Sequence, residues 1–371
     1  MNTEKCVEYS VSSTDAFFEP SVEVTQFDQL RGEVESEFEV EDAFMEYGIP
    51  TFYVKLREDS KQAFLRLVER LDATDFVPIL RRREEKVVLQ VVRKPQVGPS
   101  RKIVNLALFL ATIGTTFLTG YILSAGWVTQ GLMPEPISGA AMFTVAIMAI
   151  LVAHEMGHKL TADRHGVEAT MPYFIPGPPP NLGGVGTFGA VIQQKSLPPN
   201  KDALFDLGAS GPIVGFIVAV IVTIVGIPLS HLVTIEPGAL TLPTPILFVF
   251  IGILFPPGGT SGNAVLLHPV AFAGWVGMLI TMLNLVPAGM LDGGHAMRSL
   301  FGEQTCRILS FIAAIILFLS GYVLMAMFAF LLSMQRHPGP LDDVSKLTIR
   351  RKLVFLVLVS IFVLCLALPI F

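Results

Sequence analysis

Cysteine is scarce in this sequence of 371 residues, which contains only Cys6, Cys306 and Cys365. Three cysteines this far apart indicate neither a disulfide framework nor a thiolate metal site. Histidine is scarce as well: 7 residues are too few for the histidine clusters of a di-iron desaturase. The N-terminus lacks an apolar run, so we expect no cleavable signal peptide.

Charged residues are also few, at 15% of the chain, whereas soluble domains carry about 25%. Hydrophobic residues make up 52%, and the mean hydropathy is +0.61, so the composition predicts a membrane protein. The first 100 residues hold 20 of the 31 acidic residues and 13 of the 26 basic ones. We therefore expect an acidic, water-soluble N-terminal part joined to a nearly uncharged membrane part, with nothing that indicates nucleic-acid binding.

The N-terminal part is predicted to contain two regions. Residues 1–45 form an acidic segment that is either disordered or helical. Residues 46–98 are predicted to be a small α+β domain, with strands at 51–56, 76–80 and 87–92 and a helix at 61–71. No catalytic set is visible in this domain, which favours an adaptor or regulatory role.

Residues 99–371 are predicted to be a polytopic α-helical membrane domain with about six transmembrane helices and a core at about 137–296. The expected spans are 103–127, 137–160, 203–229, 264–290, 305–333 and 353–370, with 244–256 as a re-entrant or interfacial segment. Basic residues before the first span, such as Arg101 and Lys102, place the N-terminal domain on the cytoplasmic side. The same alternation places the basic loop before the last span outside. Either one boundary is wrong or the 244–256 segment spans.

The stretch His154-Glu-Met-Gly-His158 closes the second span. On a helix, residues four apart share one face, so the two imidazoles can bind one Zn²⁺ while Glu155 takes a proton from an activated water. Ionisable side chains are costly in a bilayer, so three within five residues favour a functional site over polar residues at the membrane boundary.

The fourth span ends in a helix-breaking stretch from Asn284 to Gly294, with Pro287 inside it. Asp292 in this apolar context is costly unless it is paired or bound to a metal, and it is the natural third ligand; the alternative is a helix cap. Two histidines, one carboxylate and a water make an open catalytic zinc site, which predicts amide hydrolysis of a membrane-embedded peptide.

Two further stretches surround this predicted site. The long loop 161–202 is rich in proline and glycine, and its residues 185–193 are predicted to be a strand or hairpin. It is either a plain connector or an edge strand that captures an unwound peptide through backbone hydrogen bonds. The third span carries Gly208-Ala-Ser-Gly-Pro212 and Gly215, which either permit close helix packing or shape a wall of the site.

Together, the histidine motif, the Gly-x-x-Gly-Pro stretch and Asn-x-x-Pro-x-x-x-x-Asp-Gly resemble the site-2 protease family of intramembrane zinc metalloproteases, peptidase family M50. The resemblance covers residues 100–300 and is nearest to an archaeal and cyanobacterial–plastid branch. It implies His154, His158 and Asp292 as zinc ligands and Glu155 as catalytic base. Asn284 matches a position that orients the substrate or stabilises the oxyanion.

The resemblance also implies a substrate membrane protein with a transmembrane helix, in the bilayer of a prokaryotic, archaeal-like cell. One departure is Gly289, where the family often has a second proline, which puts the local shape in doubt. His268 and His295 are expected to have structural or supporting roles. Two other functions stay open: a divalent metal-ion transporter, which gives Glu155 no role, and a catalytically inactive membrane scaffold.

Overall fold

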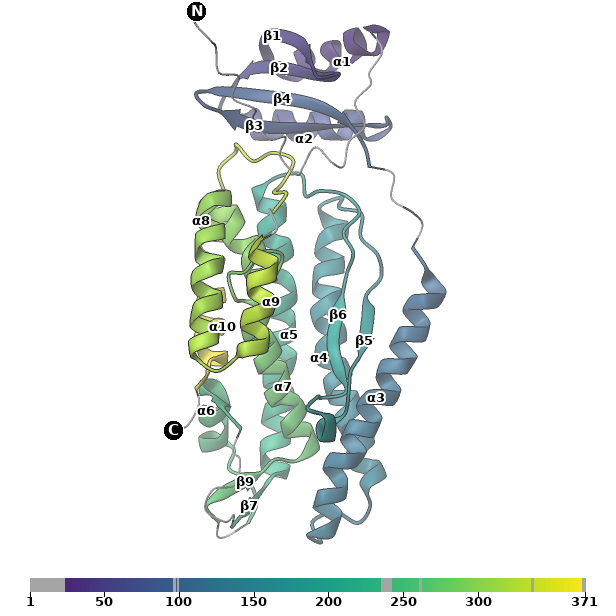
Figure 1. Cartoon of the computed structure of the whole chain (residues 1–371), viewed down its shortest axis with the longest axis vertical. Helices are drawn as coiled ribbons and strands as arrows, with labels where there is room; N and C mark the ends of the chain where they lie inside the picture. The colour runs from purple at the N-terminus through teal and green to yellow at the C-terminus, as the bar shows by residue number, and fades with distance from the viewer. Residues whose placement is uncertain are drawn as a thin grey trace, which may run out of the picture. The chain divides into compact units, whose positions relative to one another are not determined.

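The computed structural model describes residues 24–95, 98, 100–234, 242–259, 262–334 and 337–368, which form two compact units (Figure 1). Unit 1 contains the chain up to Gly98 together with two short distant segments, Pro199–Lys201 and Pro338–Lys346. Unit 2 contains the rest of the chain. The division follows the drop in charge that the sequence shows after its first hundred residues.

Unit 1 is built on an antiparallel sheet with the strand order β1-β2-β4-β3. Its elements are α1 (Val24–Glu37), β1 (Glu39–Glu46), β2 (Ile49–Lys55), α2 (Ser60–Asp72), β3 (Phe76–Arg83) and β4 (Lys86–Arg93). The helix and the three strands expected between residues 51 and 92 are present. Residues 24–45 of the acidic segment form α1 and most of β1. The part before residue 24 lies outside the described residues.

The core of unit 1 lies between the sheet and its helices. The ring of Phe27 in α1 stacks on Phe52 of β2, and α2 buries Phe64 and Leu67. The β1–β2 turn has positive φ at both Tyr47 and Gly48, the backbone that tight two-residue hairpins favour because it matches the twist of the strands.

The segment Pro338–Lys346 adds a short parallel pairing to the edge of this sheet. The N–H of Leu80 in β3 donates to the carbonyl of Leu341 at 2.9 Å, and the N–H of Asp343 donates to the carbonyl of Leu80 at 3.2 Å. The N–H of Asp342 in turn donates to Pro199, from the second short segment. Two loops from far along the chain therefore complete the N-terminal domain.

Unit 2 is helical, with three small antiparallel strand pairs and a few isolated bridges among its described residues. Its elements are α3 (Lys102–Thr129), α4 (Pro136–Arg164), β5 (Tyr173–Pro176), η2 (Pro180–Leu182), β6 (Thr187–Val191), α5 (Lys201–Leu229), β7 (His231–Val233), β8 (Thr244–Pro245), α6 (Ile246–Leu254), β9 (Ala264–Leu266), α7 (Pro269–Asn284), α8 (Asp292–Leu319), α9 (Val323–Met334), α10 (Ile349–Cys365) and β10 (Ala367–Leu368). Among the described residues, α3, α4, α5 and α8 are long and apolar enough to cross a membrane. The helices and their composition are those of a membrane protein, whereas the count of six spans stays a prediction.

The helix α8 reverses direction at Gly302, whose φ of 81° is not helical. In a straight helix Gly294 and Cys306 would lie about 18 Å apart along the axis. Here the Sγ of Cys306 lies 3.6 Å from the carbonyl oxygen of Gly294. Phe311 then contacts Phe330 of α9, so the end of α8 and α9 form a second antiparallel pair. The prediction of one continuous span over 305–333 was therefore wrong.

This reversal removes the conflict over the basic loop before α10. Arg351 in the first turn of α10 donates to the carboxylate of Asp206 in the second turn of α5, so these two helices start on the same side of unit 2. The chain reverses at Gly302 and again between α8 and α9, so the simple alternation that placed the last loop on the opposite side fails. Helix α6, at 9 residues or about 14 Å, is too short to span.

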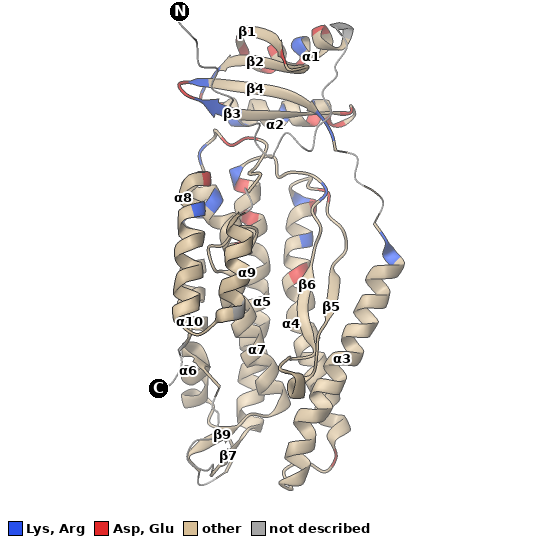
Figure 2. Ribbon diagram, viewed as in Figure 1, with Lys and Arg blue, Asp and Glu red and all other residues tan. Residues whose placement is uncertain are grey.

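Glycines bring the central helices of unit 2 into close contact. A Cβ on Gly120 of α3 would lie 2.8 Å from the Cα of Ala140 in α4, and a Cβ on Gly226 of α5 would lie 2.3 Å from the backbone nitrogen of Ala271 in α7. Such small residues let membrane helices approach each other's backbones. Most charged residues of these long helices lie near their ends, including the starts of α3 and α5 (Figure 2).

Candidate metal centre

Helix α4 presents two histidines one turn apart on one face. The Nε2 atoms of His154 and His158 lie 3.1 Å apart, and both side chains are largely buried. In an α-helix residues i and i+4 are neighbours, which explains how a five-residue motif brings two ring nitrogens to one point. The pairing is local and follows from α4 being helical through residue 164.

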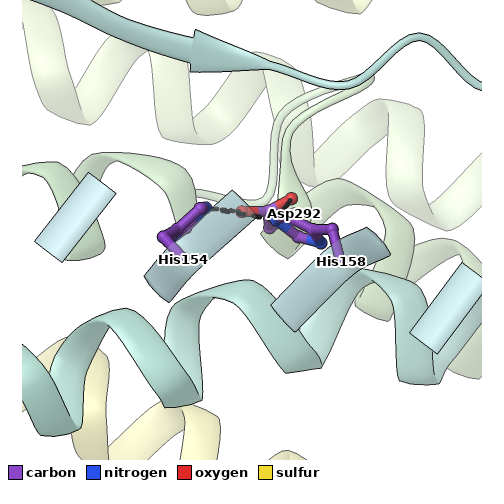
Figure 3. A group of neighbouring side chains, drawn as sticks. All are labelled: His154, His158 and Asp292. Carbon is purple, nitrogen blue, oxygen red and sulfur yellow. Dashed lines mark hydrogen bonds and ion pairs between the residues drawn. The ribbon is translucent and has the colours of Figure 1, made fainter. Parts of the chain in front are cut away.

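The third member of the cluster comes from a distant part of the chain. Asp292 is the first residue of α8, and its carboxylate oxygens lie 3.2 Å from Nε2 of His154 and 3.3 Å from Nε2 of His158. Figure 3 shows the carboxylate pointing toward both imidazoles. The three ligand atoms lie within 4.8 Å of one another, and the described residues contain one such group that could hold a metal ion.

These distances fit a tetrahedral metal. With bonds of about 2.0 to 2.1 Å, ligand atoms around tetrahedral zinc lie about 3.3 Å apart. The two Nε2 atoms are 3.1 Å apart, and each has one carboxylate oxygen of Asp292 at 3.2 or 3.3 Å, Oδ2 beside His154 and Oδ1 beside His158. Two imidazoles and a carboxylate leave a fourth position open, the arrangement of catalytic rather than structural sites.

The orientation of His158 is fixed by the backbone of α5. Its Nδ1 lies 2.7 Å from the carbonyl oxygen of Leu207, a hydrogen bond in which Nδ1–H donates. This bond selects the tautomer whose Nε2 lone pair is available to a metal, and such partners typically raise the affinity of a metal site. The role of the Leu207 carbonyl could not be predicted from the sequence, because a backbone atom carries no residue-type signal.

Glycines of α5 form the wall behind both histidines. A Cβ on Gly211 would lie 2.1 Å from Nε2 of His158, and one on Gly215 would lie 3.0 Å from Nδ1 of His154. A Cβ on Gly208 would lie 2.6 Å from the carbonyl oxygen of Asp292. Two roles are predicted from the sequence for these glycines, close helix packing or a wall of the site. Both are present, because the close approach of α5 also shapes the site.

The break before α8 depends on glycine as well. Gly289 has a φ of 45°, and a Cβ there would lie 2.6 Å from the carbonyl oxygen of Leu332. Proline is locked near −65°, so this backbone excludes the second proline that the motif often carries. A Cβ on Gly293 would lie 2.2 Å from the carbonyl oxygen of Leu285, so the turn closes tightly just before and after Asp292.

A cavity of about 190 Å³ opens beside the three side chains. Glu155, which is buried, lines it, and so does Asn284, whose Nδ2 lies 3.3 Å from Nε2 of His154. The far wall comes from β6 and the residues just after it, Ala190, Val191, Ile192 and Gln194. Of the strand or hairpin predicted within 185–193, the strand is present as β6, which pairs with β5 from the earlier part of the loop, and it borders the site.

The two additional histidines lie outside the cluster. The Nδ1 of His268 accepts a hydrogen bond from the N–H of Val270, which caps the start of α7. His295 lines the cavity, but its Nδ1 lies 2.7 Å from Nε2 of His337. His337 was not singled out from the sequence, because a lone histidine in a loop carries no pattern.

Residues 142–328, half of the chain, match peptidase family M50, and they include all three metal-binding candidates. The chain belongs to this family. Its matched region begins in α4 and ends in α9, so it encloses both helices that supply the cluster.

Several curated relatives carry zinc metalloprotease names. The probable zinc metalloprotease EGY1, chloroplastic, of Arabidopsis thaliana is 30% identical over 70% of this chain and 52% of its own length. The protein of the same name from Oryza sativa subsp. japonica is 32% identical over 45% and 29%. The probable zinc metallopeptidase EGY3, chloroplastic, of A. thaliana is 27% identical over 58% and 39%.

The chain spans about half the length of the Arabidopsis EGY1 protein and less of the other two. No solved structure matches the chain. The relatives are named as chloroplast proteins, so the prokaryotic source expected from the sequence stays a prediction.

Proposed function

We propose that the protein is an intramembrane zinc metalloprotease that hydrolyses peptide bonds in or near the transmembrane segments of membrane proteins. One observation carries the proposal: His154 and His158 of α4 meet Asp292 of α8, although the two helices are separated by 128 or more residues in the sequence. A buried glutamate and a strand lie beside this cluster. Zinc suits this donor set, because two imidazoles and a carboxylate favour it. Bound there, it would polarise a carbonyl and acidify a water.

The protein's own groups then carry the protons. The carboxylate of Glu155 accepts a proton as the water oxygen attacks the scissile carbonyl carbon, and it passes that proton to the departing amide nitrogen. The carbon–oxygen bond forms first and the carbon–nitrogen bond breaks once its nitrogen takes the proton, so one water yields one carboxyl and one amine. The Nδ2–H of Asn284 donates to the carbonyl oxygen as negative charge develops on it.

The strand β6 holds the peptide in an extended form. A transmembrane helix hides its carbonyls in hydrogen bonds, so it must unwind before attack. Within its hairpin β6 pairs with β5, and the residues at its end line the cavity. Backbone pairing of an unwound peptide with this strand would leave its scissile carbonyl at the metal.

The N-terminal unit is proposed to be cytoplasmic. Basic residues lie at the starts of both α3 and α10, at Arg101 and Lys102 and at Arg350 to Lys352. Positive charge beside membrane helices favours the cytoplasmic face. Labelling of single cysteines introduced at the starts of α3 and α10 in sealed vesicles tests this: both positions should share one accessibility.

A comparison of the wild-type protein with three variants tests the proposal. Zinc content of detergent-purified protein should be one per chain, lost in His154→Ala and Asp292→Ala and retained in Glu155→Gln. Cleavage of a reporter with a transmembrane helix should be lost in all three. A transporter would keep its zinc flux in Glu155→Gln, which vesicle uptake measures. Zinc and cleavage both retained in Asp292→Ala would refute the ligand set.

A further inference from the structure

A second pair of buried histidines lies next to the metal-binding cluster. Nδ1 of His295 and Nε2 of His337 are 2.7 Å apart, and their rings are nearly perpendicular. Both side chains are buried, at 9% and 8% exposure. Such a short contact in a buried place is a hydrogen bond that fixes both rings. Nothing in the proposed chemistry uses His337.

His295 follows Asp292 by three residues, in the first turn of α8. Its N–H donates to the carbonyl of Leu291, so this turn is hydrogen-bonded from its start. On one side the turn rests against α5, where a Cβ on Gly208 would lie 2.7 Å from the Cβ of His295. The ring of His337 holds the same residue through its side chain. A shift of His295 must therefore move the turn that carries Asp292.

We propose that His337 is a positioning residue for the metal centre: it orients Asp292 through His295. The inference rests on the proposed ligand set. The route is a chain of named contacts rather than proximity alone.

The zinc dissociation constant of the full-length protein, measured by competition with a chelator, tests whether His337 positions the metal centre. His337→Phe keeps the ring volume but loses the hydrogen bond, and it should weaken zinc binding by about 10- to 100-fold. The visible absorption bands of the Co²⁺-substituted protein should also change, because they report ligand geometry. His337→Gln places an amide near the original Nε2 and should restore both. The matched control is His231→Ala, a histidine outside the cavity.

The outcomes separate the two proposals. Zinc retained in Asp292→Ala overturns the ligand set itself. Zinc lost in Asp292→Ala, with wild-type affinity and an unchanged Co²⁺ spectrum in His337→Phe, overturns the positioning role alone.

Discussion

The wall of α5 behind the metal centre makes a sharp prediction at Gly211. In Gly211→Ala the new Cβ would lie 2.1 Å from Nε2 of His158, whereas ordinary contacts begin near 3.4 Å. The ring must therefore move by about 1.3 Å, the difference of the two distances. Metal–ligand bonds tolerate about 0.2 Å. The ring cannot move freely, because its Nδ1 is bonded to the carbonyl of Leu207.

We expect Gly211→Ala to fold and to bind zinc at least about 100-fold more weakly. Folding should survive, because alanine is favoured over glycine in a helix by about 1 kcal/mol and the contacted atoms are the end of one side chain. Gly215→Ala, with its nearest contact at 3.0 Å from Nδ1 of His154, should cost about 10-fold or less. Gly114→Ala in α3, with no atom within 4 Å, should cost nothing.

Chelator competition and metal content measure the order of this series, and the thermal unfolding temperature checks the fold. If Gly211→Ala binds zinc as tightly as Gly114→Ala does, then α5 does not press on the ligand as the structure has it. A Gly211→Ala protein that fails to fold would equally contradict the reasoning, because the steric cost would then lie in the scaffold instead of the site.

Two further predictions follow from other contacts. Asn284→Ala should keep zinc and lower kcat about 100-fold, as expected for loss of one oxyanion donor; zinc lost with it would give Asn284 a binding role. Arg351 donates to both carboxylate oxygens of Asp206, so Arg351→Ala should cost about 2 kcal/mol of stability, seen as a lower unfolding temperature, and an unchanged temperature would refute this.

The sequence predicted most of the centre because its signals are local. His154 and His158 meet through helical spacing alone, and Asp292 is conspicuous as a carboxylate in an apolar stretch. The small domain between β2 and β4 was visible because alternation and helical period are properties of single segments. Their joint function stays a proposal, since the geometry shows proximity and not chemistry.

The reversal of α8 was not predictable in the same way. Hydropathy measures whether a segment tolerates lipid, and residues 305–333 are apolar throughout. Hydropathy does not show where a helix reverses direction, so Gly302 and Gly321, which form the turns, looked like ordinary glycines of a membrane helix. The side on which α10 begins follows only once those turns are placed.

The sequence by itself determined that this is a membrane protein, that two of its histidines share one helix face, and that a broken helix carries a carboxylate. Tertiary structure alone decided that the carboxylate reaches those histidines, that α5 offers glycines at their rings, and that His337 holds His295. The physical reason is that helical period and hydropathy act within one segment. Contacts between segments depend on how closely two backbones approach, which here is set by the glycines of α5 and of the break before α8.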